Sequence, residues 1–146
     1  MLRGNCPATI DDSGRLKIPT TFRSYLESHY GLEFYVTSLD GQSARVYPLV
    51  EWEKLENKLK EQPTMNQSVK KFLEHTNYFG QVCRIDGQGR ILIPAVLRES
   101  AAMQGEVAVL GYFSYLEVWN NQRYREHLEK APLTDEDRQV LSNLGI

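Results

Sequence analysis

The chain has 146 residues, of which 41% are hydrophobic and 25% are charged, and its formal net charge is −2. These values are typical of a globular chain with one domain, or of two small halves that share a core, and they exclude a disordered or fibrous protein. The two cysteines provide no disulfide framework, no apolar run is long enough to cross a bilayer, and the start lacks the apolar stretch of a secretory signal. We therefore expect a cytoplasmic protein without a membrane partner.

A ten-residue segment occurs twice along the chain. IDDSGRLKIP at residues 10–19 returns as IDGQGRILIP at residues 85–94. A constant shift of 75 residues aligns seven identities in fourteen positions without a gap, and weaker similarity links residues 33–48 to 106–120. The chain is therefore predicted to contain two copies of one unit, each with the order strand, turn, strand, helix, strand, turn, strand.

The first copy shows how each element is specified. A strand leads into a turn at residues 11–14, and Leu16 and Ile18 then face one side of the next strand, because strand side chains alternate. Pro19 ends that strand and can begin a helix, where its missing N–H costs nothing. Gly31 is a plausible end for this helix. The second copy repeats the plan.

Helical material follows each copy. Residues 50–76 carry two apolar stripes at helical spacing, one around Trp52 and one around Phe72, split near Pro63. The pattern of residues 132–146 predicts a short helix capped by Thr134. Acidic residues fall in its first turn, where the helix dipole favours negative charge.

These elements predict an α+β fold with four parts. The first unit spans residues 5–52, a helical connector 53–78, the second unit 81–124 and a helical tail 125–146. One such unit is too small to bury a stable core. We therefore expect the two units to pair within the chain as a pseudo-dimer.

The turns have a clear local chemistry. Asp11 and Asp86 can each accept a hydrogen bond from a backbone N–H two residues further on, which closes an Asx-turn. Gly14 and Gly89 can supply the positive φ that a tight reversal needs. These four residues are predicted to shape the two turns.

An arginine follows each turn. A single solvated arginine at a hairpin tip would need no function, but Arg15 and Arg90 stand at the same spacing on the two most basic stretches of the chain. A guanidinium held by a stiff turn suits guanine O6 and N7, or phosphate oxygens. Lys17 shares the face of Arg15 and would add a phosphate contact, whereas the second copy has Leu92 there. The two tips are therefore expected to contribute unequally to DNA binding.

Four further arginines are weaker candidates. Arg3 and Arg84 flank the hairpins and could contact DNA. Arg23 and Arg98 fall on the helices after the prolines, where an internal salt bridge that ties helix to turn is the simpler expectation.

The residues described so far resemble a known family. The opening MLRG, the Asp-x-x-x-Arg motifs at 11–15 and 86–90, the stretch YPLVEWEKLENKL and the length are similar to the MraZ family, which belongs to the AbrB-like, swapped-hairpin DNA-binding proteins. The resemblance covers nearly the whole chain. It implies tandem AbrB-like units and a sequence-specific transcriptional regulator on the nucleoid. Asp12 departs from the pattern by adding a carboxylate to the first turn.

The resemblance also implies partners. It implies binding to short direct repeats in double-stranded DNA upstream of the cell-division and cell-wall gene cluster that includes the protein's own gene. It further implies assembly into a homo-oligomeric ring, with the hairpins on the DNA. By motif position, the DNA contacts fall on Arg15 and Arg90.

Other classes of function have less support. The cysteines and histidines show no metal-ligand spacing, and no nucleophile–base set or phosphate-binding glycine loop is present. We therefore expect no enzyme activity, no metal, no cofactor and no small-molecule substrate. A ring-forming scaffold for protein interactions, with arginines that serve only as subunit contacts, remains an alternative. The salt dependence of binding distinguishes a DNA-binding protein from such a scaffold, because DNA binding through arginine weakens steeply as the salt concentration rises.

Overall fold

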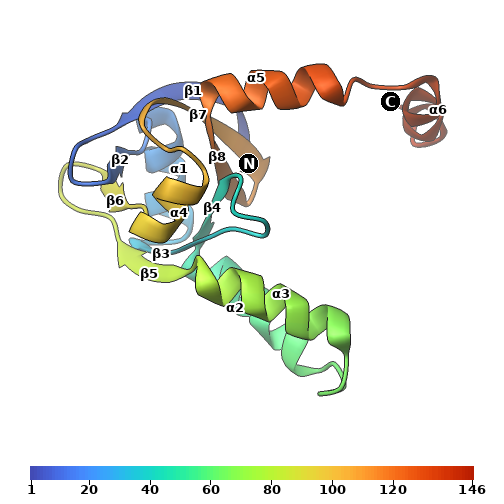
Figure 1. Ribbon diagram of the computed structural model, residues 1–146, viewed down its shortest axis with the longest axis horizontal. Helices are drawn as coiled ribbons and strands as arrows, with labels where there is room; N and C mark the ends of the chain where they lie inside the picture. Colours follow the sequence, from blue (N-terminus) through green and yellow to red (C-terminus); the bar gives the residue numbers. More distant parts are fainter.

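The computed structural model describes all 146 residues and confirms the α+β class (Figure 1). The eight strands are β1 (Leu2–Ile10), β2 (Arg15–Lys17), β3 (Glu33–Thr37), β4 (Ala44–Pro48), β5 (Gln81–Arg84), β6 (Arg90–Leu92), β7 (Gly105–Phe113) and β8 (Tyr115–Asn120). The six helices are α1 (Thr20–His29), α2 (Leu49–Lys60), α3 (Gln67–Tyr78), α4 (Ala95–Ser100), α5 (Asn121–Lys130) and α6 (Asp135–Asn143). No helix is both long and apolar enough to cross a membrane.

All strands form one antiparallel sheet in the order β5-β3-β4-β8-β7-β1-β2-β6. The two edge strands, β5 and β6, follow each other in the chain, so the sheet curls into a near-barrel. Most of its pairings join the two sequence repeats. β1 pairs with β7 from Leu2↔Phe113 to Ile10↔Gly105, and β5 pairs with β3. Each repeat thus gives its first strand to the third strand of the other, and neither repeat has a complete sheet alone.

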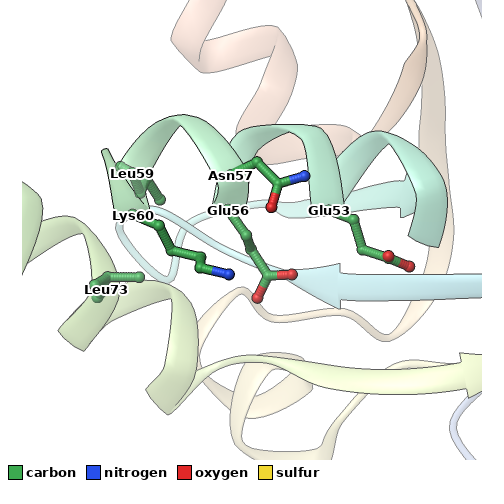
Figure 2. A pocket seen from close by; sticks show the side chains of 6 residues that line it. All are labelled: Glu53, Glu56, Asn57, Leu59, Lys60 and Leu73. Atoms are coloured by element: carbon green, nitrogen blue, oxygen red, sulfur yellow. The ribbon is translucent and has the colours of Figure 1, made fainter. Parts of the chain in front are cut away.

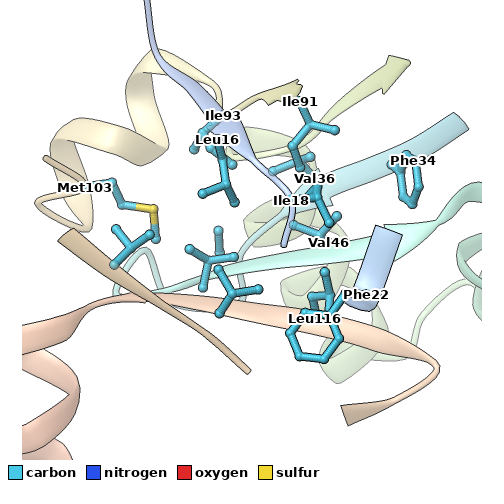
Figure 3. Close-up of a cluster of buried hydrophobic side chains, with 14 of the residues drawn as sticks. Leu16, Ile18, Phe22, Phe34, Val36, Val46, Ile91, Ile93, Met103 and Leu116 are labelled. Carbon is cyan, nitrogen blue, oxygen red and sulfur yellow. The ribbon is translucent and has the colours of Figure 1, made fainter. Parts of the chain in front are cut away.

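The core lies between the repeats. Leu16, Ile18, Ile91 and Ile93, the apolar residues after the two turns, are each at most 2% exposed (Figure 3). They belong to one cluster of 19 buried residues drawn from both repeats. Burial of such a side chain contributes about 1.5–3 kcal/mol each. The shared core explains why units too small to fold alone occur together.

Proline and glycine set the ends of the first helix as the sequence predicts. Pro19 is the N-cap of α1, and Pro94 is the N-cap of α4. Gly31 follows α1 with a φ of +97° and donates its N–H to the Leu26 carbonyl at 3.2 Å. Only a residue without Cβ adopts this conformation without strain.

Two helical pairs project from the sheet (Figure 1). α2 and α3 form an antiparallel hairpin in which Trp52 stacks on Phe72, as the two apolar stripes predict. α2 begins at Leu49, so the expected boundary after residue 52 falls inside this helix. α5 and α6 bury no residue, and α6 begins with a capping box between Thr134 and Asp137, in agreement with the predicted capped helix.

Candidate nucleic-acid interface

The first turn is closed by one carboxylate. Asp11 Oδ1 accepts the N–H groups of Ser13 and Arg15, both at 2.9 Å, and the Ser13 hydroxyl at 2.6 Å. Gly14 has a φ of +85° and donates its N–H to the Asp11 carbonyl at 3.0 Å. The hydrogen bonds, led by that of the Ser13 hydroxyl and followed by that of the Arg15 N–H, lower the pKa of Asp11. The ionised carboxylate therefore holds the turn.

The second turn repeats this geometry. Asp86 Oδ1 accepts the N–H groups of Gln88 and Arg90, both at 2.9 Å, and Gly89 has a φ of +78°. The Arg90 N–H is the main cause that lowers the pKa of Asp86. The difference from the first turn lies at the third position, where Gln88 stands in place of a serine.

The two turns lie side by side because their outgoing strands pair. In the β2–β6 register, Leu16 is opposite Ile91, Lys17 opposite Arg90 and Arg15 opposite Leu92. Beyond the ladder, the Ile18 N–H donates to the Gly89 carbonyl at 2.9 Å, and the Ile93 N–H donates to the Gly14 carbonyl at 3.0 Å. This reciprocal pattern joins the two hairpins into one rigid ribbon.

One face of this ribbon is cationic. Leu16 and Ile91 point into the core, so Arg15, Lys17 and Arg90 share the opposite face, because residues directly opposed in an antiparallel pair point the same way. Lys17 is exposed, while Arg15 and Arg90 are half-buried. The structure therefore brings together three of the five basic residues predicted to contact DNA.

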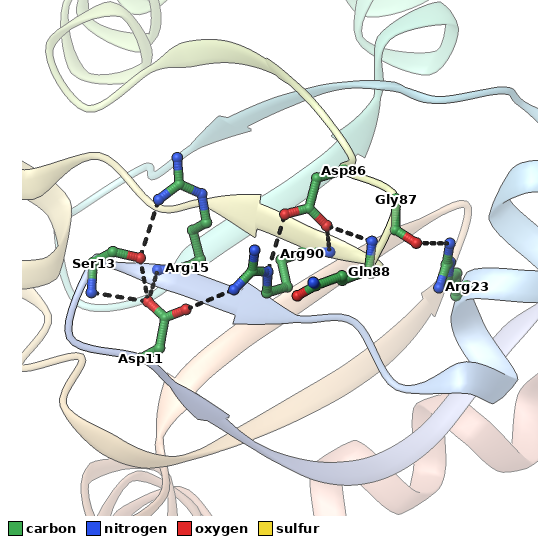
Figure 4. A network of polar contacts seen from close by, with 8 residues as sticks. All are labelled: Asp11, Ser13, Arg15, Arg23, Asp86, Gly87, Gln88 and Arg90. Atoms are coloured by element: carbon green, nitrogen blue, oxygen red, sulfur yellow. Dashed lines mark hydrogen bonds and ion pairs between the residues drawn. The ribbon is translucent and has the colours of Figure 1, made fainter.

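The two arginines have different partners (Figure 4). Arg90 Nε donates to Asp86 Oδ2 at 3.0 Å, and Arg90 Nη1 lies 3.5 Å from Asp11 Oδ2 on the other hairpin. Arg15 Nη1 donates instead to the Ser13 hydroxyl at 3.0 Å and forms no ion pair. The charge of Arg15 is thus free for an external anion, whereas Arg90 is shared between two carboxylates.

The two helix arginines, Arg23 on α1 and Arg98 on α4, pack against the turn glycines of the ribbon. A Cβ atom on Gly14 would clash with Arg98 Cζ, and one on Gly89 would lie 2.7 Å from Arg23 Nη1. Arg98 Nε donates to the Ile93 carbonyl at 2.9 Å. Each guanidinium therefore lies against the turn of the other repeat.

The expected salt bridge from helix to turn is not present at either arginine. Arg23 pairs with Glu27 of its own helix at 2.8 Å and reaches the turn only through the Gly87 carbonyl at 3.5 Å. Arg98 forms no ion pair and bonds to a carbonyl. The reason is that the turn carboxylates are already used by backbone N–H groups and by Arg90.

The two flanking arginines lie apart from the cationic face to different degrees. Arg84 ends β5, two residues before Asp86, and is paired in register with Glu33. Arg3 lies near the start of β1, seven residues before Ile10, or roughly 23 Å along the strand at the usual rise per residue. Arg3 is therefore not part of the cluster at the hairpin tips.

Metal-ligating and nucleophilic residues do not gather at the ribbon. No group of three or more His, Cys, Asp or Glu side chains is arranged to hold a metal ion. Burial raises the pKa of the Cys83 thiol to about 11, which keeps it protonated at neutral pH.

Sequence reasoning missed two contacts at the tips. It did not anticipate the ion pair from Arg90 to Asp11 of the other hairpin, because nothing in the chain order shows which turns become neighbours. It also missed Ser13 as the partner of Arg15, although a serine two residues before an arginine on a turn is a signal for that bond.

The fold is an α+β near-barrel whose two paired hairpins present Arg15 and Lys17 without ion pairs, and comparison with known proteins shows the family to which the chain belongs. The family model for the MraZ protein, described as antitoxin-like, matches residues 1–75 and 80–143. The chain is 48% identical over 146 residues to the transcriptional regulator MraZ of Acidobacterium capsulatum, with the full length of both chains covered. It is 49% identical over 147 residues to that of Koribacter versatilis, again over both full lengths. The chain belongs to the MraZ family.

Proposed function

We propose that this protein is a sequence-specific DNA-binding regulator of transcription. It binds short direct repeats in its own promoter, upstream of the cell-division and cell-wall gene cluster, and it acts in the cytoplasm on the nucleoid. Membership of a family whose members are named transcriptional regulators supports the regulatory part. The cationic face of the β2–β6 ribbon supports the DNA part, and its unpaired Arg15 is the single observation that carries the proposal.

The ribbon has dimensions and chemistry that suit a major groove. Two paired strands are about 4.8 Å apart, and a major groove about 12 Å wide admits a two-stranded ribbon. Arg15 is the candidate for bidentate contact with guanine or phosphate, and Lys17 is a candidate for phosphate. Arg90 would act partly by masking Asp11 and Asp86, whose charges repel DNA. Arg84 and Arg3 are proposed as peripheral contacts.

We also propose the AbrB-like swapped-hairpin arrangement for the two units. Its support is the exchange of first strands, β1 onto β7 and β5 onto β3, between residues 5–52 and 81–124. Two matched segments of the family model agree with a tandem organisation. The connector at 53–78 and the tail at 125–146 are then additions to the paired units.

The protein is proposed to act as a homo-oligomer in a closed ring. One chain provides one ribbon, because the two hairpin tips pair with each other. Several direct repeats therefore require several chains held at fixed spacing, which a symmetric assembly supplies.

The test is a titration of DNA from just upstream of the protein's own gene, with scrambled DNA as a control. We expect the specific DNA to bind at least tenfold more tightly and the affinity to fall steeply with salt. The double variant Arg15→Ala/Arg90→Ala is expected to lose specific binding while its melting temperature stays close to that of the parent. Arg125→Ala, an exposed cation on α5 without a bonded partner, is the matched control and is expected to bind normally.

One result would favour the scaffold alternative instead. If the double variant and the parent bind the upstream DNA equally, and salt has no effect on either, the arginines do not read DNA. The proposed function would then be wrong, whatever the state of assembly.

A further inference from the structure

The hollows of the surface do not define a ligand. Figure 2 shows the one between α2 and α3, of about 450 Å³, where the carboxylates of Glu53 and Glu56 lie near Lys60. A lining that mixes carboxylates with an ammonium group favours neither an anion nor a cation. In Figure 1 these helices project away from the two hairpin turns. The β2–β6 ribbon is more informative, because its register fixes the neighbours of each side chain.

The outer face of the ribbon carries one apolar side chain among its charges. Ile91 is 1% exposed in the core, so strand alternation points its neighbour Leu92 to the outer face. Leu92 is half-buried, and it belongs neither to the cluster of 19 core residues nor to the partly buried residues packed against that cluster. Packing of the core therefore does not account for this leucine.

The register places Leu92 beside the arginine that has no ion pair. Leu92 is directly opposite Arg15, and Arg90 is directly opposite Lys17. The Cβ atoms of directly opposed residues in an antiparallel pair are about 4.5–5.5 Å apart. A ligand on this face thus meets two cations without ion pairs on β2, and an apolar side chain and a doubly paired arginine on β6.

The two sequence repeats differ at this position. The shift of 75 residues that aligns them places Leu92 where the first repeat has Lys17. On a face that bound phosphate alone, a second lysine would add attraction and a leucine would add none. An apolar side chain gains free energy when it removes another apolar group from water. Leu92 therefore indicates that the ligand carries an apolar group near the base or phosphate that Arg15 contacts.

The major groove of DNA presents such a group. Thymine carries a C5 methyl group there, whereas the other groups that distinguish the base pairs are hydrogen-bond donors and acceptors. Successive bases along one strand are about 3.4 Å apart. A side chain that begins about 5 Å from Arg15 therefore reaches a base within about two base pairs of the one that Arg15 contacts.

We propose that Leu92 is a specificity-determining residue that contacts the C5 methyl group of a thymine in the major groove. The thymine lies within about two base pairs of a guanine that Arg15 contacts. The inference rests on the proposed DNA-binding function and names part of the sequence that the ribbon recognises. Arg15 selects its base by hydrogen bonds, and Leu92 selects its base by apolar contact.

Replacement of each thymine of the upstream DNA by deoxyuridine, one position at a time, tests the contact. Uracil forms the same base pair with adenine and lacks only the methyl group. One thymine in each bound repeat is expected to be sensitive, with affinity lowered about fourfold, which corresponds to the burial of one methyl group. This series uses the parent protein, so its result does not depend on the folding of a variant.

Variants assign the sensitive thymine to Leu92. Leu92→Ala is expected to bind the thymine and uracil forms equally, and Leu92→Ile, which keeps a branched apolar side chain, is expected to retain the preference for thymine. Lys17→Ala removes a cation from the same face and is expected to weaken both forms alike. Leu128→Ala on α5, where the leucine is 53% exposed, is the matched control and is expected to behave as the parent does.

Replacement of guanine by 7-deazaguanine tests the distance between the two contacts. The analogue lacks N7, so the guanine that Arg15 contacts is the one whose replacement weakens the parent but not Arg15→Ala. The sensitive thymine is expected within about two base pairs of that guanine. A sensitive thymine elsewhere, or the absence of an Arg15-dependent guanine, would overturn the proposed arrangement.

The proposed function and this inference fail in different ways. A parent that binds upstream and scrambled DNA equally would overturn both. A parent that binds the upstream DNA specifically, yet tolerates uracil at every thymine, would overturn the role of Leu92 alone. The same conclusion would follow from a Leu92→Ala variant that still prefers thymine to uracil.

Discussion

The two hairpin tips share one motif but differ in what their arginines bind. In the first, Asp11 Oδ1 is occupied by Ser13 and by backbone N–H groups, and Arg15 bonds to the neutral Ser13 hydroxyl. In the second, no serine is present, and Arg90 bonds to Asp86 directly. The remaining oxygen of Asp11 then attracts Arg90 as well. The exchange of Ser13 in the first turn for Gln88 in the second thus accompanies a change from an arginine without an ion pair, Arg15, to an arginine with two, Arg90.

This difference in ion pairing predicts different roles for Arg15 and Arg90 in DNA binding. An arginine without an ion pair can bind an external anion and keep its internal contacts, whereas an arginine between two carboxylates must share its charge. Exposed ion pairs contribute only about 0–1 kcal/mol to stability. The ion pairs of Arg90 therefore matter more for the electrostatic field at the proposed DNA face than for the stability of the fold.

The strongest test of the comparison is DNA affinity after loss of each arginine. Arg15→Ala is expected to reduce specific affinity by about 1–3 kcal/mol, or roughly 5- to 150-fold, because a direct contact is lost. Arg90→Ala is expected to cost less, and mainly through unmasked repulsion. A fluorescence anisotropy titration at one fixed salt concentration measures both, and equal losses would contradict the different roles of the two arginines.

Substitution of the turn glycines compares the two tips by stability. Gly14→Ala places a Cβ in a clash with Arg98 Cζ and forces alanine to a φ of +85°, which costs about 1–2 kcal/mol for the backbone alone. Gly89→Ala meets Arg23 at 2.7 Å and is expected to cost less. Gly4→Ala, with a φ of +87° and open space around it, measures the backbone cost by itself. Thermal unfolding gives the order, and a Gly14 variant no less stable than the Gly4 variant would show that Arg98 moves aside.

Removal of the Asp11 carboxylate should free Arg90 from one of its two ion pairs and so make the two hairpin tips more alike. In Asp11→Asn the amide oxygen can still accept the Ser13 and Arg15 N–H groups, but the cross-tip ion pair and one negative charge are lost. DNA affinity is expected to rise several-fold. The same change added to Arg90→Ala should recover part of the lost affinity, and added to Arg15→Ala should recover less. Equal recovery of DNA affinity in the Arg90→Ala and Arg15→Ala variants would contradict the proposal that Arg90 masks the charge of Asp11.

A fall in pH should reduce the stability that both turns contribute, and this is the smallest of the four effects predicted for the tips. The pKa values of Asp11 and Asp86 are lowered in the folded chain, so the unfolded chain binds more protons between those values and about 4. Their stabilising contribution is present above that range and disappears as the pH falls through the folded pKa values.

The measurement is the melting temperature between pH 2 and pH 6. Asp11→Asn/Asp86→Asn is expected to flatten its decline below pH 4. The decline should not vanish, because Asp137 of the α6 cap also has a lowered pKa. An unchanged slope would mean that the turn carboxylates do not contribute to acid unfolding.

Local chemistry explains what could be predicted from the sequence. The positions of the strands after the turns, the prolines at the starts of α1 and α4, and the Thr134 cap follow from residues within a few positions of one another. The alternation of Leu16 and Ile18 with charged neighbours also indicated which face enters the core. The salt bridges from helix to turn expected for Arg23 and Arg98 were wrong, because each guanidinium lies against a glycine of the other repeat's turn rather than against a turn carboxylate.

The sequence by itself determined the repeats, their secondary structure and the Asp-x-x-x-Arg turns, since each depends on short-range steric and hydrogen-bonding preferences. The tertiary structure alone decided that β1 pairs with β7, that β2 lies beside β6, and that Asp11 meets Arg90. These contacts join residues about 75 to 110 positions apart. They form only when both repeats bury one core, and that packing places a free Arg15 beside a neutralised Arg90.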